Sequence, residues 1–197
     1  MRAITDSGMA VWLAEDGTWV AEEQTQILAK EGFRKSPWGA SLCEVKAAEA
    51  QEPRQERDDY LDFEVKLGSF SCRAVFIFVG DKLVRGKYRI LDDYQNPIKY
   101  LSVYDELRDS VSKKYGSVIE DKSYWLNDLY KSDYREWGMA VARGHLSKFA
   151  LWETSESKIT LGLLGERSNV SVVVEYAGKA FDGVEEAAKE ASLLGDL

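Results

Sequence analysis

The segment from Lys122 to Trp137 gathers the side chains of this sequence that are best suited to binding chemistry. Aromatic rings lie there among the carboxylates of Asp128, Asp133 and Glu136. Rings stack on the apolar faces of ligands and partners, while carboxylates accept hydrogen bonds from hydroxyl groups. The candidate binding residues in this segment are Tyr124, Trp125, Tyr130, Tyr134 and Trp137.

Three interpretations of these rings stay open: a sugar cleft, a protein-docking surface, and a cover over the hydrophobic core. The spacing of Trp125, Leu126, Leu129 and Tyr130 predicts a short helix, which favours the cover. A docking surface ranks second, and a sugar cleft third.

Two carboxylates of this segment, Asp128 and Asp133, could act as a pair in glycoside hydrolysis. Such enzymes hold their two carboxyl groups about 5 Å apart when they retain configuration, and about 6.5–9.5 Å apart when they invert it. The chain carries 34 acidic residues, so many other pairs are equally available. A carboxylate-based hydrolase acting on glycans or cell-wall material is therefore kept as the alternative function.

The supply of other catalytic and metal-binding side chains is small. His145 is the one histidine, and the two cysteines, Cys43 and Cys72, are far apart in sequence. A structural zinc site needs about four ligands, usually in closely spaced pairs. A Ser-His-Asp or Cys-His set would have to use His145, beside which the sequence places neither a nucleophile nor an orienting acid. We expect no catalytic residue, no metal and no cofactor, and favour a protein that is not an enzyme.

Residues 9–23 predict a β-hairpin that supplies a second candidate surface. The Asp-Gly pair at 16–17 is typical of a type I′ turn. The expected register sets Trp12 opposite Ala21 and places Trp12 and Trp19 on one face. An edge strand carrying two indoles can add to a neighbouring sheet, so both tryptophans are candidate binding residues. Packing of this hairpin on its own domain is the competing interpretation.

The elements that position these candidates follow from hydrophobic periodicity. Capping boxes at Ser41 and at Ser102 predict two helix starts. A closing helix is expected from near Asp182, with Val184, Ala188 and Ala191 buried. Strands are expected at 61–67, 70–79, 83–91, 146–153, 158–164 and 170–176.

This order predicts an α+β fold: an N-terminal β-hairpin followed by two α-β-β-β units that form an antiparallel sheet with helices on one face. Residues 1–32 are assigned to the hairpin and a connector. Residues 33–197 are assigned to one α+β domain of two tandem units, 33–98 and 99–197. The repeated order indicates a structural duplication.

Two stretches carry a resemblance to uncharacterised bacterial proteins. The sequence Val11 to Trp19 resembles a V-x-L-x-x-D-G-T-W hairpin, and Phe33 to Val45 is similar to an F-R-x-x-x-W-G-x-S-x-x-x-V module that ends in K-Y-G, here 114–116. The resemblance covers about residues 9–116. It implies the fold but no activity, because that group has no established reaction and is often exported. The tandem α-β3 order is also similar to the β-lactamase-inhibitor-protein fold in topology alone, and an inhibitor of another enzyme is a third functional interpretation.

Composition restricts the partners and the location. Lys and Arg total 26 against 34 acidic residues, a net charge of −8, which disfavours nucleic acid. No apolar run approaches the ~18 residues of a membrane span, so no membrane insertion is expected. The first residues lack the apolar core of a secretory leader. A cytoplasmic location is expected, with a periplasmic or secreted one open if a leader was removed.

These observations favour a non-catalytic binding or interaction protein. Its expected partner is another protein or a second copy of this chain, joined through the N-terminal hairpin.

Overall fold

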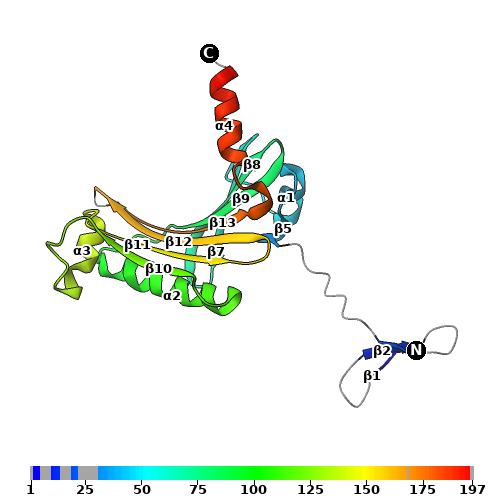
Figure 1. Ribbon diagram of the computed structural model, residues 1–197, viewed down its shortest axis with the longest axis horizontal. Coiled ribbons are helices and arrows are strands. Elements are labelled where there is room, and N and C mark those ends of the chain that lie inside the picture. The colour runs from blue at the N-terminus through cyan, green and yellow to red at the C-terminus, as the bar shows by residue number, and fades with distance from the viewer. Residues whose placement is uncertain (1, 5–9, 14–18, 22–30, 168, 196–197) are drawn as a thin grey trace. The chain divides into compact units, whose positions relative to one another are not determined.

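The computed structural model describes residues 2–4, 10–13, 19–21, 31–167 and 169–195 (Figure 1). The chain divides into two compact units, Met1–Glu31 and Gly32–Leu197. The first unit contains a three-stranded antiparallel sheet of β1 (Arg2–Ile4), β2 (Ala10–Leu13) and β3 (Trp19–Ala21).

The register of β2 and β3 corrects the expected hairpin. Trp12 pairs with Val20, and Leu13 pairs with Trp19, one residue away from the expected pairing. Turn type and loop length set hairpin register, and the pairing expected from a two-residue turn does not form. A one-residue shift exchanges the faces of a strand, so Trp12 and Trp19 do not occupy the same face of the ladder. The Asp-Gly pair itself lies outside the described residues.

The second unit is built on an eight-stranded antiparallel sheet, in the order β10-β11-β12-β13-β9-β8-β7-β6. Its strands are β6 (Gln55–Arg57), β7 (Tyr60–Leu67), β8 (Phe70–Val79), β9 (Lys82–Ile90), β10 (Glu120–Trp125), β11 (Leu146–Glu153), β12 (Ser157–Glu166) and β13 (Asn169–Gly178). A separate two-stranded ladder joins β4 (Gly32–Phe33) to β5 (Ser36–Pro37). The helices are α1 (Leu42–Glu49), α2 (Ile98–Tyr115), α3 (Trp137–Ala142) and α4 (Val184–Gly195), with 3-10 turns η1 (Tyr134–Glu136) and η2 (Lys179–Phe181).

The expected α+β fold, with an antiparallel sheet and helices against it, is confirmed. The six expected strands are present within a few residues of their expected bounds. Two further strands, β6 and β10, were not expected, so four strands follow α1 and four follow α2. Both are edge strands made mostly of exposed polar residues, and they lack the apolar alternation that reveals a half-buried strand.

Helices α1 and α2 both start where the sequence supplies hydrogen bonds for free backbone amides. At α1 the expected capping box forms: the Glu44 amide donates to Ser41 Oγ over 3.3 Å, and the Ser41 amide donates to Glu44 Oε2 over 2.7 Å. The start expected for the second helix at Ser102 is wrong. Helix α2 begins at Ile98, whose amide donates to the side chain of Asn96, and Pro97 supplies a helix-compatible φ of −61°.

The core lies on one face of the sheet. Strand residues that point to this face are fully buried, and Val45 of α1 and Leu101 of α2 belong to the same cluster. Figure 1 shows α2 and α3 beneath the second half of the sheet. The largest fully buried residues in the strands of this sheet are Leu61, Phe63, Phe76, Leu83, Leu146, Trp152, Ile159, Leu161 and Leu163.

The opposite face of the sheet carries charged cross-strand pairs. Arg73 Nε lies 3.6 Å from the fully buried carboxylate of Asp62. Arg85 pairs with Glu175 at 2.6 Å and with Glu185 of α4 at 2.7 Å. The basic residues of this face are therefore partly neutralised by acids on adjacent strands and on α4.

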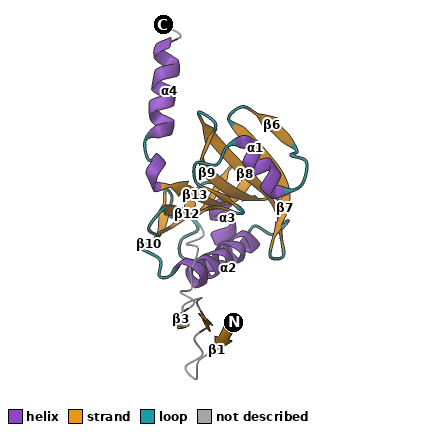
Figure 2. Ribbon diagram, turned by 90° about the vertical axis from the view of Figure 1, so that its right-hand side faces the viewer, coloured by secondary structure: helices purple, strands orange, loops and turns teal. Residues whose placement is uncertain are grey.

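The expected burial of α4 is wrong at the positions that the structure describes. Ala188 is exposed and Val184 is only half-buried, while the side chain of Ala191 lies outside the description. Figure 2 shows α4 projecting away from the sheet. The turn at Gly183, with a φ of 77°, redirects the chain just before the helix starts. The Arg85–Glu185 pair then holds the first turn of the helix.

The two cysteines are both free thiols in contrasting environments: Cys43 is exposed and Cys72 is buried. Burial raises the pKa of Cys72 to about 11. Since the thiolate is the reactive form, iodoacetamide at mildly alkaline pH should alkylate Cys43 and leave Cys72 intact in the folded protein. Peptide mass mapping measures this. Comparable labelling of both thiols in native buffer would contradict the described burial, and labelling in denaturant is the positive control.

Candidate binding surface

The ring-rich segment forms one end of the second unit. Trp125 ends the edge strand β10, where it pairs with Leu146 of β11. The amide of Leu126 extends this ladder by donating to the carbonyl of His145 over 2.8 Å. The short helix expected over residues 125–130 is therefore wrong, because the backbone at its start is already committed to the strand pairing. The helical part of the segment comes later, in η1 and α3.

The rings that follow β10 pack on one another. Trp125 and Trp137 meet edge to face with centroids 5.3 Å apart, and Tyr134 lies 5.1 Å from Trp137. Tyr130 stacks on His145 at 5.5 Å. The structure therefore brings together three of the five rings singled out in this segment, Trp125, Tyr134 and Trp137, from three different elements, whereas Tyr130 packs on His145.

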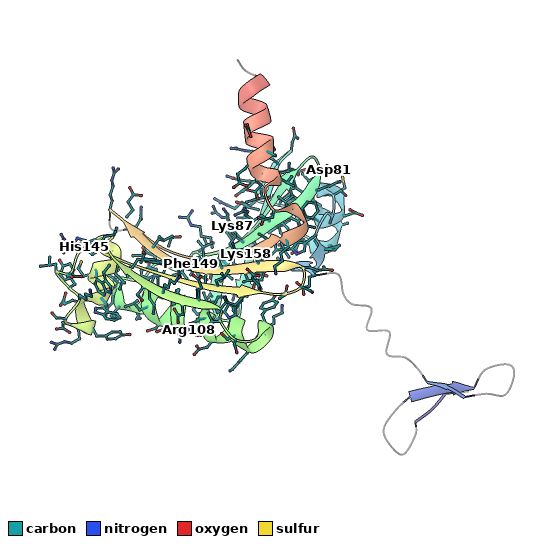
Figure 3. The ribbon with its side chains drawn as sticks, viewed as in Figure 1. Asp81, Lys87, Arg108, His145, Phe149 and Lys158 are labelled. Atoms are coloured by element: carbon teal, nitrogen blue, oxygen red, sulfur yellow. The ribbon has the colours of Figure 1, made fainter. Side chains whose placement is uncertain are left out.

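Hydrogen bonds and charges hold this cluster in place. The indole of Trp137 donates to the carbonyl of Lys131 over 3.1 Å, which folds the loop back onto α3. The ammonium of Lys131 lies 5.9 Å from the centre of the Trp125 ring. At the start of β10, away from the cluster, Asp121 lies 3.2 Å from Arg108 of α2, which Figure 3 labels. The edge strand is thus tied to the helix beneath it.

Two glycines let α3 approach its neighbours closely. A Cβ at Gly138 would meet the backbone of Pro97 and Ile98 at the start of α2. A Cβ at Gly165 of β12 would meet the carbonyl oxygen of Val141. Any larger residue at either position would push α3 away, so these glycines fix the platform that carries Trp137.

The apolar side chains of this segment divide into two groups. Trp125, Tyr130 and Trp137 are half-buried and pack against the core. Others face solvent to an unusual degree: Leu126 is 84% exposed, Leu129 68% and Tyr134 56%. We call the exposed group the apolar patch; it consists of Tyr124, Leu126, Leu129, Tyr134 and Met139.

Sequence reasoning singled out the rings but not Leu126, Leu129 or Met139. Leu126 and Leu129 flank the polar pair at 127–128, and that interruption was the available signal for exposure. We treated them as members of a helical stripe, which would have buried them. Trp12 and Trp19, the other candidate residues, lie in the first unit, for which only the strand register is described.

The carboxylates beside the patch are engaged by nearby bases. Asp128 lies 3.0 Å from the ammonium of Lys131, and Asp133 lies 2.7 Å from the guanidinium of Arg135. Hydrogen bonds from the side chain and then the backbone of Arg135 lower the pKa of Asp133. A general acid in glycoside hydrolysis needs a raised pKa instead. These local pairs leave little net charge around the apolar patch.

His145 lies at the end of the sheet next to α3 (Figure 3), and its ring stacks on Tyr130. Its Nδ1 atom is buried, and no hydrogen-bond partner is described for it. The backbone of His145 donates to Ala140, so the residue closes the turn after α3. The described part of the chain contains no group of three or more His, Cys, Asp or Glu side chains that could hold a metal ion.

Comparison of the sequence with protein-family models and curated proteins, and comparison with solved structures, returned no match. Among the described helices, none combines the length and the apolar character needed to cross a lipid bilayer.

Proposed function

We propose that this protein is a non-catalytic interaction protein that binds another protein through the apolar patch. The observation that carries the proposal is the exposure of Leu126 and Leu129 directly beside packed indole rings. Large apolar side chains that gather exposed on one segment often mark interaction sites. Aromatic anchors set in a rigid surround are typical of the residues that dominate binding energy.

The surroundings of the patch support a protein partner over a sugar. The nearby carboxylates are already paired with Lys131 and Arg135, so a sugar hydroxyl would compete with an ammonium or a guanidinium group for them. The patch also consists largely of aliphatic side chains, whereas the half-buried Trp125 and Trp137 present little open ring face. A second copy of this chain is the first partner to test, because the same residues would then be buried on both sides.

The test introduces charge into the patch with a matched control. The double variant Leu126→Asp/Leu129→Asp is expected to weaken association by about thirtyfold or more, the scale of a disrupted hot spot. Ile119→Asp changes an exposed apolar residue outside the patch and is expected to leave association unchanged. Sedimentation velocity over a wide concentration range measures self-association. A photo-crosslinking residue at position 134, placed in the wild-type background and in both variants and used in native cells, reports other protein partners.

The outcomes are separable. Self-association or crosslinking that disappears in the patch variant but persists in Ile119→Asp supports the proposal. Wild type and patch variant that are equally monomeric and equally free of crosslinked protein would refute it.

We further propose that residues 33–98 and 99–197 arose by duplication. Each half places a helix before four consecutive strands, apart from η1 and α3, which follow β10. The last strands of the two halves, β9 and β13, pair antiparallel at the centre of the sheet, as a two-fold axis between them would require. Related chains whose halves keep sequence similarity would support this origin, and consistent dissimilarity across relatives would count against it.

A further inference from the structure

A cavity of about 260 Å³ lies under α2 on the core face of the sheet, away from the apolar patch. One wall is the side of α2 that carries Leu107 and Val111. The floor is formed by Phe70 of β8 and Val174 of β13. Tyrosines 88, 115 and 176 line the remaining side. Apolar walls with a few converging polar groups are the usual composition of a small-molecule site.

The cavity exists because the two halves of the sheet are covered unequally. Helix α2 has 18 residues, whereas α1 has 8, so by helix geometry they span roughly 27 Å and 12 Å. Helix α2 packs on β11, β12 and β13. The shorter α1 leaves the Leu67–Phe70 end of the first half without a helix above it, and the space beside α2 stays open there.

One end of the cavity is cationic. Lys114 lines the cavity, with its ammonium 4.9 Å from the centre of the Tyr115 ring, and it makes no ion pair with any described residue. The hydroxyl of Tyr88 lies 3.5 Å from a guanidinium nitrogen of Arg34, a long contact in which the phenol oxygen accepts. The Tyr88 hydroxyl proton is then available to a ligand, as a second donor near Lys114.

The other end of the cavity carries the opposite charge. Glu106 lines it two turns before Lys114 on α2, which separates the two along the helix by about 12 Å. No ion pair between Glu106 and the rest of the described chain is present. A ligand with one negative group is attracted to the Lys114 end and repelled from the Glu106 end. The two charges therefore set the orientation of the ligand in the cavity.

We propose that this cavity binds a medium-chain carboxylate, with its carboxylate between Lys114 and the Tyr88 hydroxyl and its chain against Leu107, Phe70 and Val174. The cavity has room for about nine water molecules at ~30 Å³ each, which corresponds to a ligand of about ten non-hydrogen atoms. Octanoate has that size. The chemical class of the ligand follows from the ammonium of Lys114 (unpaired within the described chain), the hydroxyl donor of Tyr88 and the apolar walls, which all line the same cavity.

The test is an isothermal titration of the full chain with octanoate. Lys114→Gln is expected to weaken octanoate binding by about tenfold or more, because it removes a charge-assisted hydrogen bond. Lys113→Gln is the matched control and should bind as wild type does, because Lys113 is exposed as Lys114 is but does not line the cavity. Octan-1-ol, which has the same chain but no carboxylate, should bind Lys114→Gln and wild type equally.

A second variant tests the place of binding without opening the core. Ser110 lines the cavity from an exposed position on α2, so Ser110→Phe should keep the fold and fill the entrance. It is expected to abolish binding of both probes, with circular dichroism unchanged. Three results would overturn the proposal: no saturable octanoate binding by wild type, equal loss in Lys113→Gln and Lys114→Gln, or unchanged binding by Ser110→Phe.

Discussion

Replacement of Trp152 by alanine is expected to lower the free energy of unfolding by about 3–5 kcal/mol. Trp152 is fully buried on the core face of β11, and its indole donates to Ser112 Oγ of α2 over 3.1 Å. Truncation removes the ring between sheet and helix and leaves a cavity that the surrounding strands cannot close. Since small domains are stable by only about 5–15 kcal/mol, the variant should be close to unfolding at physiological temperature.

Equilibrium denaturation in urea, followed by circular dichroism, measures this loss. Trp152→Phe is the matched control: it keeps most of the ring volume and removes the indole donor, and should lose only about 1–2 kcal/mol. An alanine variant no less stable than the phenylalanine variant would show that Trp152 does not join α2 to the sheet as described.

The second large effect is expected from Arg34→Ala, at about 3 kcal/mol of lost stability. Arg34 Nε lies 2.9 Å from Glu49 Oε1, and the side chain of Glu49 is only 1% exposed. The other oxygen of Glu49 is buried without a described hydrogen-bond partner. Removal of Arg34 therefore leaves a buried carboxylate with no cation beside it, the costly half of a broken ion pair.

The exposed pair between Arg54 and Glu64 provides the control. Its side chains are 47% and 65% exposed, so Arg54→Ala should cost less than about 1 kcal/mol. The double variant Arg34→Leu/Glu49→Leu should recover most of the stability, because it removes both charges and keeps apolar volume. Urea denaturation of the wild type, the two alanine variants and the double variant measures these free energies of unfolding. Equal losses in Arg34→Ala and Arg54→Ala would contradict the buried-pair interpretation.

Interior strands could be predicted from this sequence because a strand with one buried face alternates apolar and polar residues. Leu61 to Leu67 alternates strictly, and β7 occupies nearly the same residues. The edge strands β6 and β10 carry no such signal, since neither face of Gln55–Arg57 is buried. The first helix was also predictable from its capping box. The second began earlier than expected because Asn96 and Pro97, not Ser102, satisfy its first turn.

The candidate surface was predictable in its rings and not in its geometry. Helical spacing in the sequence around Trp125 is real, but the pairing of β10 with β11 overrides it. Long-range strand pairing of this kind depends on residues more than twenty positions away, which local periodicity does not contain. The same override exposes Leu126 and Leu129, which a helix would have turned inward. The cavity under α2 could not be predicted from the sequence either, because it depends on how α1 and α2, two helices of unequal length from different halves, cover the sheet.

The central pairing of β9 with β13 has a consequence for the order of events during synthesis. β9 ends at Ile90, and its partner begins only at Asn169. While the ribosome adds the intervening residues, the edge of β9 that will pair with β13 has unpaired backbone amides and carbonyls. Loop closure over so many residues is slow, so this strand edge is open to pairing with other chains until β13 has been made.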